Sequence, residues 1–220
     1  MRHPYRLVVF DWEGTIGDTL GQILNAIIQE ANQLHLGEVD IEVARQVIVL
    51  GPVVALKKLF PHLTAQQQSE LLQAAQQAML TRSDSICITS GAREVLSQIK
   101  QAGIQLAIAT NKGHQSLVRD LDASGLSSFF DVFRSASQTK PKPSPQMLEE
   151  IMEDCGVSPE QTLMVGDSVN DIEMALQANV RAIGVDFYSQ NASSLKAAGA
   201  FDVFNSFQQL ADYLELSEGG

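Results

Sequence analysis

The segment VVFDWEGTIGDT, residues 8–19, joins an apolar run to a turn that carries two carboxylates. Its first three residues are hydrophobic without interruption, which is typical of a parallel strand buried on both faces. Asp11 and Glu13 follow on either side of Trp12, and Gly14 allows a tight turn after them. The segment therefore predicts a buried strand whose carboxyl end presents two acids.

Five further apolar runs of similar length follow and are typical of strands. Helical patterns separate them: residues 92–102 and 145–155 place apolar side chains on one face, and Gly103 and Gly156 end them. This alternation predicts an α/β fold, a doubly wound parallel sheet with a Rossmann-like core, whose ligands bind beyond the carboxyl ends of the strands. The predicted strands are residues 6–11, 104–110, 130–134, 162–166, 180–185 and 201–204.

A long helical stretch separates the first strand from the second. Apolar residues recur at helical spacing from Leu20 to Leu34, and two shorter helical pieces lie around Gly51. Thr64 and Gln67 form the pattern of a capping box for a further helix that lasts to about residue 81. We therefore expect a small helical domain, residues 17–84, inserted into a core domain of residues 1–16 and 85–220.

Composition restricts the possible partners. Hydrophobic residues make up 45% of the chain and charged residues 19%, as in ordinary soluble proteins, and no apolar run approaches the roughly 18 residues that span a bilayer. We expect a cytoplasmic protein, a monomer or a homodimer, with Cys87 and Cys155 reduced. A formal charge of −11 would repel nucleic acid and anionic membranes. A small molecule is the expected partner.

Polar residues gather where the predicted strands end. Asp11 and Glu13 close the first strand, Thr110 and Asn111 close the second, Asp167 and Asp171 follow the fourth, and Lys140 stands in the loop TKPKPSP. Each has an ordinary alternative, as a turn, a strand-end cap, a solvated cation or a helix N-cap. Together they lie at one edge of one sheet, where acids can bind Mg²⁺ and a lysine can bind phosphate oxygens.

Four segments resemble the sequence motifs of the haloacid dehalogenase superfamily of phosphatases: VVFDWEGTIGDT, IATNK, TKPKPSP and MVGDSVND. Within that superfamily the chain is most similar to the phosphoglycolate phosphatase-like hydrolases. The resemblance implies that the helical insert is a cap domain. It also implies Mg²⁺-dependent hydrolysis of small phosphomonoesters through an aspartyl phosphate.

The resemblance assigns roles to individual residues. Asp11 would be the nucleophile, and the second acid of the motif, Glu13, would protonate the leaving oxygen and then activate water. Mg²⁺ would be held by Asp11, the backbone carbonyl of Glu13 and Asp167, with Asp171 as an outer ligand or an anchor. The phosphoryl oxygens would be held by Thr110, the amide of Asn111, Lys140 and backbone amides of the turn at Gly14.

The second acid departs from the family pattern, which usually has aspartate at this position. One extra methylene in Glu13 changes where the carboxyl lies, and general acid–base catalysis depends on that placement. A catalytically attenuated protein that binds a phosphate ligand or regulates therefore stays open as an alternative. A phosphosugar mutase, another reaction on the same scaffold, also stays open. Dehalogenation needs neither a metal cluster nor an acid after the nucleophile, so Glu13, Asp167 and Asp171 argue against it.

The insert would select the substrate. Its candidate specificity residues are Arg45 and Gly51, the latter within the turn Leu50-Gly51-Pro52. An arginine on a helix is more often a solvated or ion-paired surface residue, and that alternative stays open for Arg45.

Overall fold

The structure is a computed structural model that describes residues 4–81 and 86–216. It divides into two compact units, a core of Met1–Gly17 and Ile88–Gly220 and an insert of Asp18–Cys87. The boundaries lie one and three residues beyond those expected from the sequence. None of the described helices is long and apolar enough to cross a membrane.

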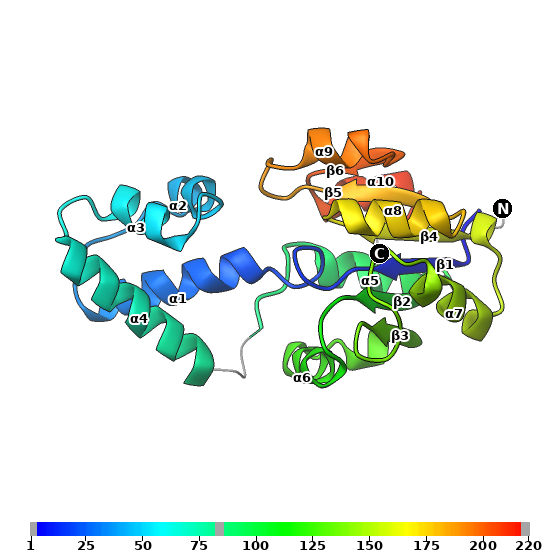
Figure 1. Cartoon of the computed structure of the whole chain (residues 1–220), viewed down its shortest axis with the longest axis horizontal. Helices are drawn as coiled ribbons and strands as arrows, with labels where there is room; N and C mark the ends of the chain where they lie inside the picture. The colour runs from blue at the N-terminus through cyan, green and yellow to red at the C-terminus, as the bar shows by residue number, and fades with distance from the viewer. Residues whose placement is uncertain (1–3, 82–85, 217–220) are drawn as a thin grey trace. The chain divides into compact units, whose positions relative to one another are not determined.

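The core is built on a six-stranded sheet in which every neighbouring pair is parallel (Figure 1). The strand order is β3-β2-β1-β4-β5-β6. All residues of β1 and β4 are buried, in agreement with their continuous apolar sequence. The predicted parallel α/β sheet is confirmed. Its strands are β1 Leu7–Phe10, β2 Gln105–Thr110, β3 Val132–Ser135, β4 Thr162–Gly166, β5 Arg181–Val185 and β6 Asp202–Phe204.

Helices cover both faces of this sheet. Helices α7, Gln146–Cys155, α8, Val169–Gln177, and α9, Ala192–Ala197, contribute to one apolar cluster against β1 and β2. Helices α5, Ala92–Gln101, and α10, Phe207–Tyr213, contact each other. Helix α6, His114–Ser124, and the short turns η1, Ser127–Phe129, and η2, Pro159–Gln161, complete the core connections. The fold thus matches the expected doubly wound architecture.

Helix α7 begins one residue later than the sequence pattern suggested. Pro145 is its N-cap, and Gln146 is its first residue. The hydroxyl of Ser144, which precedes this cap, accepts the N–H of Gln146 at 3.5 Å. The difference concerns only the first residue of the helix.

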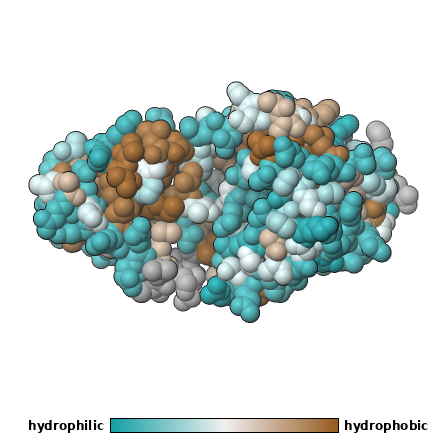
Figure 2. All heavy atoms as spheres, viewed as in Figure 1, coloured by the Kyte–Doolittle hydropathy of each residue, from teal (hydrophilic) through white to brown (hydrophobic). Residues whose placement is uncertain are grey.

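The insert contains four helices, α1 Thr19–Gln33, α2 Ile41–Ile48, α3 Pro52–Leu59 and α4 Ala65–Thr81. Helix α1 packs against α4, and Leu24, Ile27 and Leu71 are buried. The predicted capping box is present: Gln67 N–H donates to the Thr64 hydroxyl at 3.3 Å, and Thr64 N–H donates to Gln67 Oε1 at 2.9 Å. Figure 2 shows an apolar area on the insert, where Ile41, Val43, Leu50, Val53 and Val54 are exposed.

The order of the strands reverses direction at one place in the sheet. From β1 the chain continues to β2 on one side, and it later returns to β4 on the other side. Loops that leave neighbouring strands in opposite directions open a crevice at their carboxyl ends, where ligands bind in such sheets. The topology therefore places the loops after β1 and β4 at the expected ligand site.

Candidate active site

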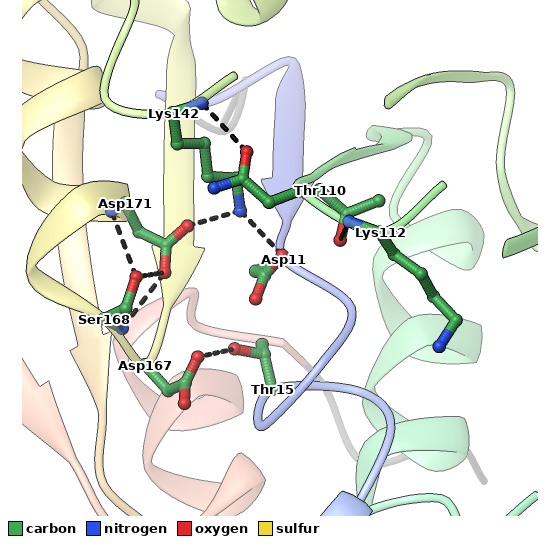
Figure 3. Close-up of polar contacts among 9 residues, drawn as sticks. Asp11, Thr15, Thr110, Lys112, Lys142, Asp167, Ser168 and Asp171 are labelled. Atoms are coloured by element: carbon green, nitrogen blue, oxygen red, sulfur yellow. Dashed lines mark hydrogen bonds and ion pairs between the residues drawn. The ribbon is translucent and has the colours of Figure 1, made fainter. Parts of the chain in front are cut away.

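Three carboxylates meet at this reversal point (Figure 3). Asp11 follows β1, Asp167 follows β4, and Asp171 lies in the first turn of α8. One oxygen from each of them lies within 4.8 Å of the others. The sequence predicted that these acids share a sheet edge, and the structure brings them together.

Burial and nearby negative charge change how Asp11 and Asp167 titrate. Burial raises the pKa of Asp11 to about 6, and the charge of Asp171 adds to this effect while Lys142 opposes it. Burial also raises the pKa of Asp167 to about 7, together with the charges of Asp11 and Asp171. Like charges held this close disfavour ionisation of one another. The positive charge of Lys142 therefore does not fully compensate the negative charge of the cluster.

The lysine at this cluster is Lys142. Its Nζ donates to Asp11 Oδ1 at 2.6 Å and to Asp171 Oδ1 at 2.5 Å, and its side chain is 3% exposed. Burial opposes its charge, but the two carboxylates outweigh that cost and hold the pKa of Lys142 above its ordinary value. Lys142 thus links the loop before α7 to β1 and α8.

The prediction of Lys140 for this role is wrong. Lys140 is exposed, and its side chain makes no hydrogen bond or ion pair with the residues that the structure describes. The segment TKPKPSP alternates lysine and proline, so its local pattern offers two equivalent candidates. A tertiary contact decides between them, because the N–H of Lys142 donates to Asn111 Oδ1 at 2.9 Å.

The loop after β2 lies at the same sheet edge. Thr110 is buried, and its hydroxyl accepts the N–H of Lys112 at 3.2 Å. The Asn111 side chain fixes the backbone of Lys142, as described above. Both predicted residues therefore lie beside the carboxylate cluster, and Asn111 has a positioning role that the sequence pattern did not reveal.

Helix α8 holds Asp171 through a capping box. The Asp171 N–H donates to the Ser168 hydroxyl at 3.4 Å, while Asp171 Oδ2 accepts the Ser168 N–H at 3.0 Å and its hydroxyl at 2.7 Å. Asp171 Oδ1 accepts from Lys142. Asp171 therefore joins Lys142 to the start of the helix, and its role as an outer ligand or an anchor stays a prediction.

Gly14 shapes the turn after Asp11. Its φ is +79°, and a Cβ at this position would lie 2.1 Å from Asp167 Oδ2. Its N–H donates to the Gly17 carbonyl at 2.9 Å. The Gly14 amide is therefore used inside the turn, and glycine is required because it lets the turn approach Asp167 closely. Phosphate binding by the backbone amides of this turn stays a prediction.

Glu13 turns its side chain toward Lys112. The Lys112 Nζ lies 3.0 Å from Glu13 Oε1 and 3.2 Å from Asp120 Oδ2. Trp12, which is buried, donates its indole N–H to the same Asp120 oxygen at 3.0 Å. Lys112 and Asp120 are not among the predicted site residues, although Lys112 belongs to the segment IATNK.

The donor set fits a divalent cation. Mg²⁺ and similar hard cations bind carboxylate and carbonyl oxygens, and Asp11 and Asp167 offer such oxygens at one place. Three acids face one buried lysine, so a bound cation would relieve the repulsion that raises the pKa values of Asp11 and Asp167. The cluster could therefore hold a metal ion.

The two candidate specificity residues belong to the insert. Arg45 is exposed on α2. Gly51 is the N-cap of α3 with a φ of +92°, and Pro52 follows as the first helical residue. A role in substrate selection stays a prediction for both.

Comparison with known proteins identifies the family to which this chain is similar. The family model of haloacid dehalogenase-like hydrolases matches residues 8–185. A probable phosphatase, IndB of Dickeya dadantii, is 32% identical over 211 residues, which cover 93% of this chain and 91% of that protein. A phosphoglycolate phosphatase of Rhodospirillum rubrum is 27% identical over 225 residues, covering 98% and 93% respectively.

A solved structure shares the fold over the whole length. It is a hydrolase of the same family from Deinococcus radiodurans with bound phosphate and sodium, and it aligns with a TM-score of 0.68 at 21% identity. The alignment covers 99% of this chain and 100% of that one. From the family match, the full-length relatives and the carboxylates at the strand reversal, we conclude that this chain belongs to the haloacid dehalogenase-like hydrolases.

Proposed function

We propose that this chain hydrolyses small phosphomonoesters in a Mg²⁺-dependent reaction that passes through an aspartyl phosphate on Asp11. One observation carries the proposal: a buried carboxylate at the end of β1 contacts a buried lysine and lies beside two more carboxylates. The names of the relatives, phosphatase and phosphoglycolate phosphatase, support the reaction class.

In this proposal Mg²⁺ would be held by Asp11, Asp167 and the backbone carbonyl of Glu13, while Asp171 would anchor the group. When bound, the ion neutralises charge so that a carboxylate can approach an anionic phosphate. The capping box on Asp171 supports the anchoring role, because it already engages one carboxylate oxygen.

The phosphoryl oxygens would be bound by Lys142, the Thr110 hydroxyl and the N–H of Asn111. An ammonium group has three donors, and Lys142 uses two of them on Asp11 and Asp171. The third is available for a phosphoryl oxygen. Asn111 supports this geometry by fixing the backbone of Lys142.

In the first step a carboxylate oxygen of Asp11 attacks phosphorus, and the bond from phosphorus to the ester oxygen breaks. The leaving oxygen takes a proton from the Glu13 carboxyl and departs as an alcohol. Lys142 orients the Asp11 carboxylate for attack, because its ammonium group donates a hydrogen bond to Oδ1.

In the second step water attacks the phosphorus of the aspartyl phosphate. The Glu13 carboxylate takes a proton from this water, the bond from phosphorus to Asp11 breaks, and inorganic phosphate leaves. Both residues return to their starting protonation states. Glu13 thus serves as acid and then as base, with no net proton change on the protein.

The proposal is tested with phosphate esters and the purified full chain. We expect inorganic phosphate to be released from at least one of phosphoglycolate, glycerol phosphate and p-nitrophenyl phosphate when Mg²⁺ is present, and not in excess chelator. Full activity in chelator would contradict the mechanism. Release of an isomerised phosphosugar without free phosphate would point to a mutase instead.

Asp11→Asn is the matching variant, because it keeps the size of the side chain and removes the attacking oxyanion. We expect no phosphate release and an unchanged circular dichroism spectrum. Beryllium fluoride, which mimics an acyl phosphate on a carboxylate, should raise the Tm of wild type but not of Asp11→Asn. Turnover near the wild-type rate in the variant would show that another residue is the nucleophile.

A further inference from the structure

The side chain of Glu13 is held by the loop after β2. Lys112 Nζ lies 3.0 Å from Glu13 Oε1. Lys112 is itself fixed at both ends, because its N–H donates to the Thr110 hydroxyl and its Nζ contacts Asp120 Oδ2 at 3.2 Å. The lysine is therefore a defined support and not a solvated cation, with 20% of its side chain exposed.

Asp120 closes these contacts into a ring. Its Oδ2 also accepts the indole N–H of Trp12 at 3.0 Å, and Trp12 precedes Glu13 in the chain. Trp12 is 1% exposed, so the ring is attached to the apolar core. The ring of contacts thus begins at Trp12 and ends at Glu13, which are adjacent residues of the same turn. Asp120 and Lys112 lie between them.

We propose that Lys112 and Asp120 are positioning residues that set the place of the Glu13 carboxyl for acid–base catalysis. The proposal rests on the function proposed above and extends it to two residues outside the carboxylate cluster. It also explains the length of the second acid. Shortening Glu13 to aspartate would withdraw the carboxyl by about one C–C bond, roughly 1.5 Å, and break its contact with Lys112.

A surface ion pair of no consequence is the competing explanation, since 52% of the Glu13 side chain is exposed and exposed pairs often contribute little. The two explanations differ in what they predict for the leaving group. A misplaced general acid slows esters with a poor leaving group, such as glycerol phosphate, because the departing alkoxide needs a proton. It hardly affects p-nitrophenyl phosphate, whose leaving group departs without one.

The experiment measures kcat and KM of Lys112→Met, Asp120→Asn and Glu13→Gln on both esters. We expect Glu13→Gln to lower kcat on glycerol phosphate by about 10²-fold or more, and Lys112→Met by about tenfold or more, with much smaller changes on p-nitrophenyl phosphate. Asp120→Asn, which can still accept from Trp12, should give a smaller fall in the same direction. KM should change little.

Two further variants separate positioning from general stability. Lys196→Met removes an exposed ion pair in which Lys196 Nζ lies 2.7 Å from Asp202 Oδ1. This pair is not part of the site, so the substitution should leave kcat unchanged. Lys112→Arg keeps the charge and should restore part of the loss. Adding Lys112→Met to Glu13→Gln should lower kcat no further, because Lys112 then no longer positions a group that can transfer a proton.

A kcat on glycerol phosphate within twofold of wild type in Lys112→Met, while Glu13→Gln has collapsed, would overturn the positioning role and leave the proposed function intact. An unaffected Glu13→Gln would overturn the acid–base assignment together with this inference. The thermal double-mutant cycle of Glu13→Gln and Lys112→Met applies even if no ester is turned over. A non-additive Tm shift of about 1–3 °C supports the contact, and strict additivity contradicts it.

Discussion

At the scale of single residues, the buried lysine decides the electrostatics of the site. Lys142 contacts Asp11 and Asp171 over less than 3 Å in surroundings from which water is largely excluded. Such a pair costs desolvation energy to form, but removing one partner leaves the other charges buried without compensation, which typically costs about 3–5 kcal/mol. The lysine therefore matters both for the fold of the loop and for the orientation of Asp11.

Lys142→Met should lower kcat by about 10²–10³-fold, the range found when one donor to developing charge is removed. It should also lower the Tm, since two carboxylates lose their partner. Lys140→Met is the matched control, because Lys140 lies two residues away on the surface. Steady-state kinetics and thermal unfolding of both variants check the prediction. Equal losses in the two variants would contradict the assignment of Lys142.

The residue scale is also where the sequence was least informative. The acids Asp11, Asp167 and Asp171 could be predicted, because the first two directly follow strands, the third lies in the helix turn just after, and parallel strands end at one edge. The choice of Lys142 depends on a contact between two loops that lie far apart in the chain. Local patterns contain no record of such contacts.

At the scale of elements, helix α8 connects stability to the site. Its capping box satisfies the N–H groups at the start of the helix and, in the same contacts, orients Asp171 toward Lys142. Helix α10 has a simpler N-cap, in which the Ser206 hydroxyl accepts the Gln209 N–H at 3.4 Å. The cap of α8 therefore both stabilises its helix and orients a site residue, whereas the cap of α10 only stabilises its helix.

Ser168→Ala and Ser206→Ala should each lower the free energy of unfolding by about 0.5–2 kcal/mol, the usual cost of a lost N-cap. Only Ser168→Ala should also lower kcat, because Asp171 then loses the hydroxyl that holds Oδ2. Denaturant unfolding and steady-state kinetics of both variants provide the measurements. An equal kcat in the two variants would show that Asp171 is held well enough without Ser168.

Elements themselves were well predicted from the sequence. Six apolar runs became six strands, with ends that differ by at most two residues, because a parallel strand buried on both faces needs continuous hydrophobic residues. The capping box at Thr64 was visible because its two partners are only three residues apart. The start of α7 was missed by one residue, since Ser144 and Pro145 both suit a helix start.

At the scale of the whole molecule, the chain carries a net charge of −11 and places three of its acids at one point. Raised pKa values mean that the folded state binds protons more tightly than the unfolded state. For Asp11 and Asp167, whose ordinary pKa is 3.8, this stability is present at low pH and is lost as the pH rises through about 6 to 7. The metal-free chain should therefore be less stable at pH 8 than at pH 5.5.

Thermal unfolding in chelator at these two pH values checks this expectation. A loss of about 2 kcal/mol would lower the Tm by about 4–8 °C. Asp167→Asn should flatten the pH dependence and raise the Tm at pH 8, although it should abolish phosphate release. Mg²⁺ should raise the wild-type Tm more at pH 8 than at pH 5.5. A wild-type Tm in chelator that rises from pH 5.5 to pH 8 would contradict the prediction.

The chain leaves the core at Gly17 and returns to it at Ile88, and these two residues form an antiparallel bridge. Directly beside it, Thr89 N–H donates to the Ile16 carbonyl and the Thr89 hydroxyl to the Thr15 carbonyl, at 2.9 and 2.8 Å. The chain therefore leaves and re-enters the core at one closed junction, held by hydrogen bonds among core residues. Since loop-closure entropy grows only slowly with length, evolution could exchange, enlarge or shorten the intervening segment at little cost to the stability of the core.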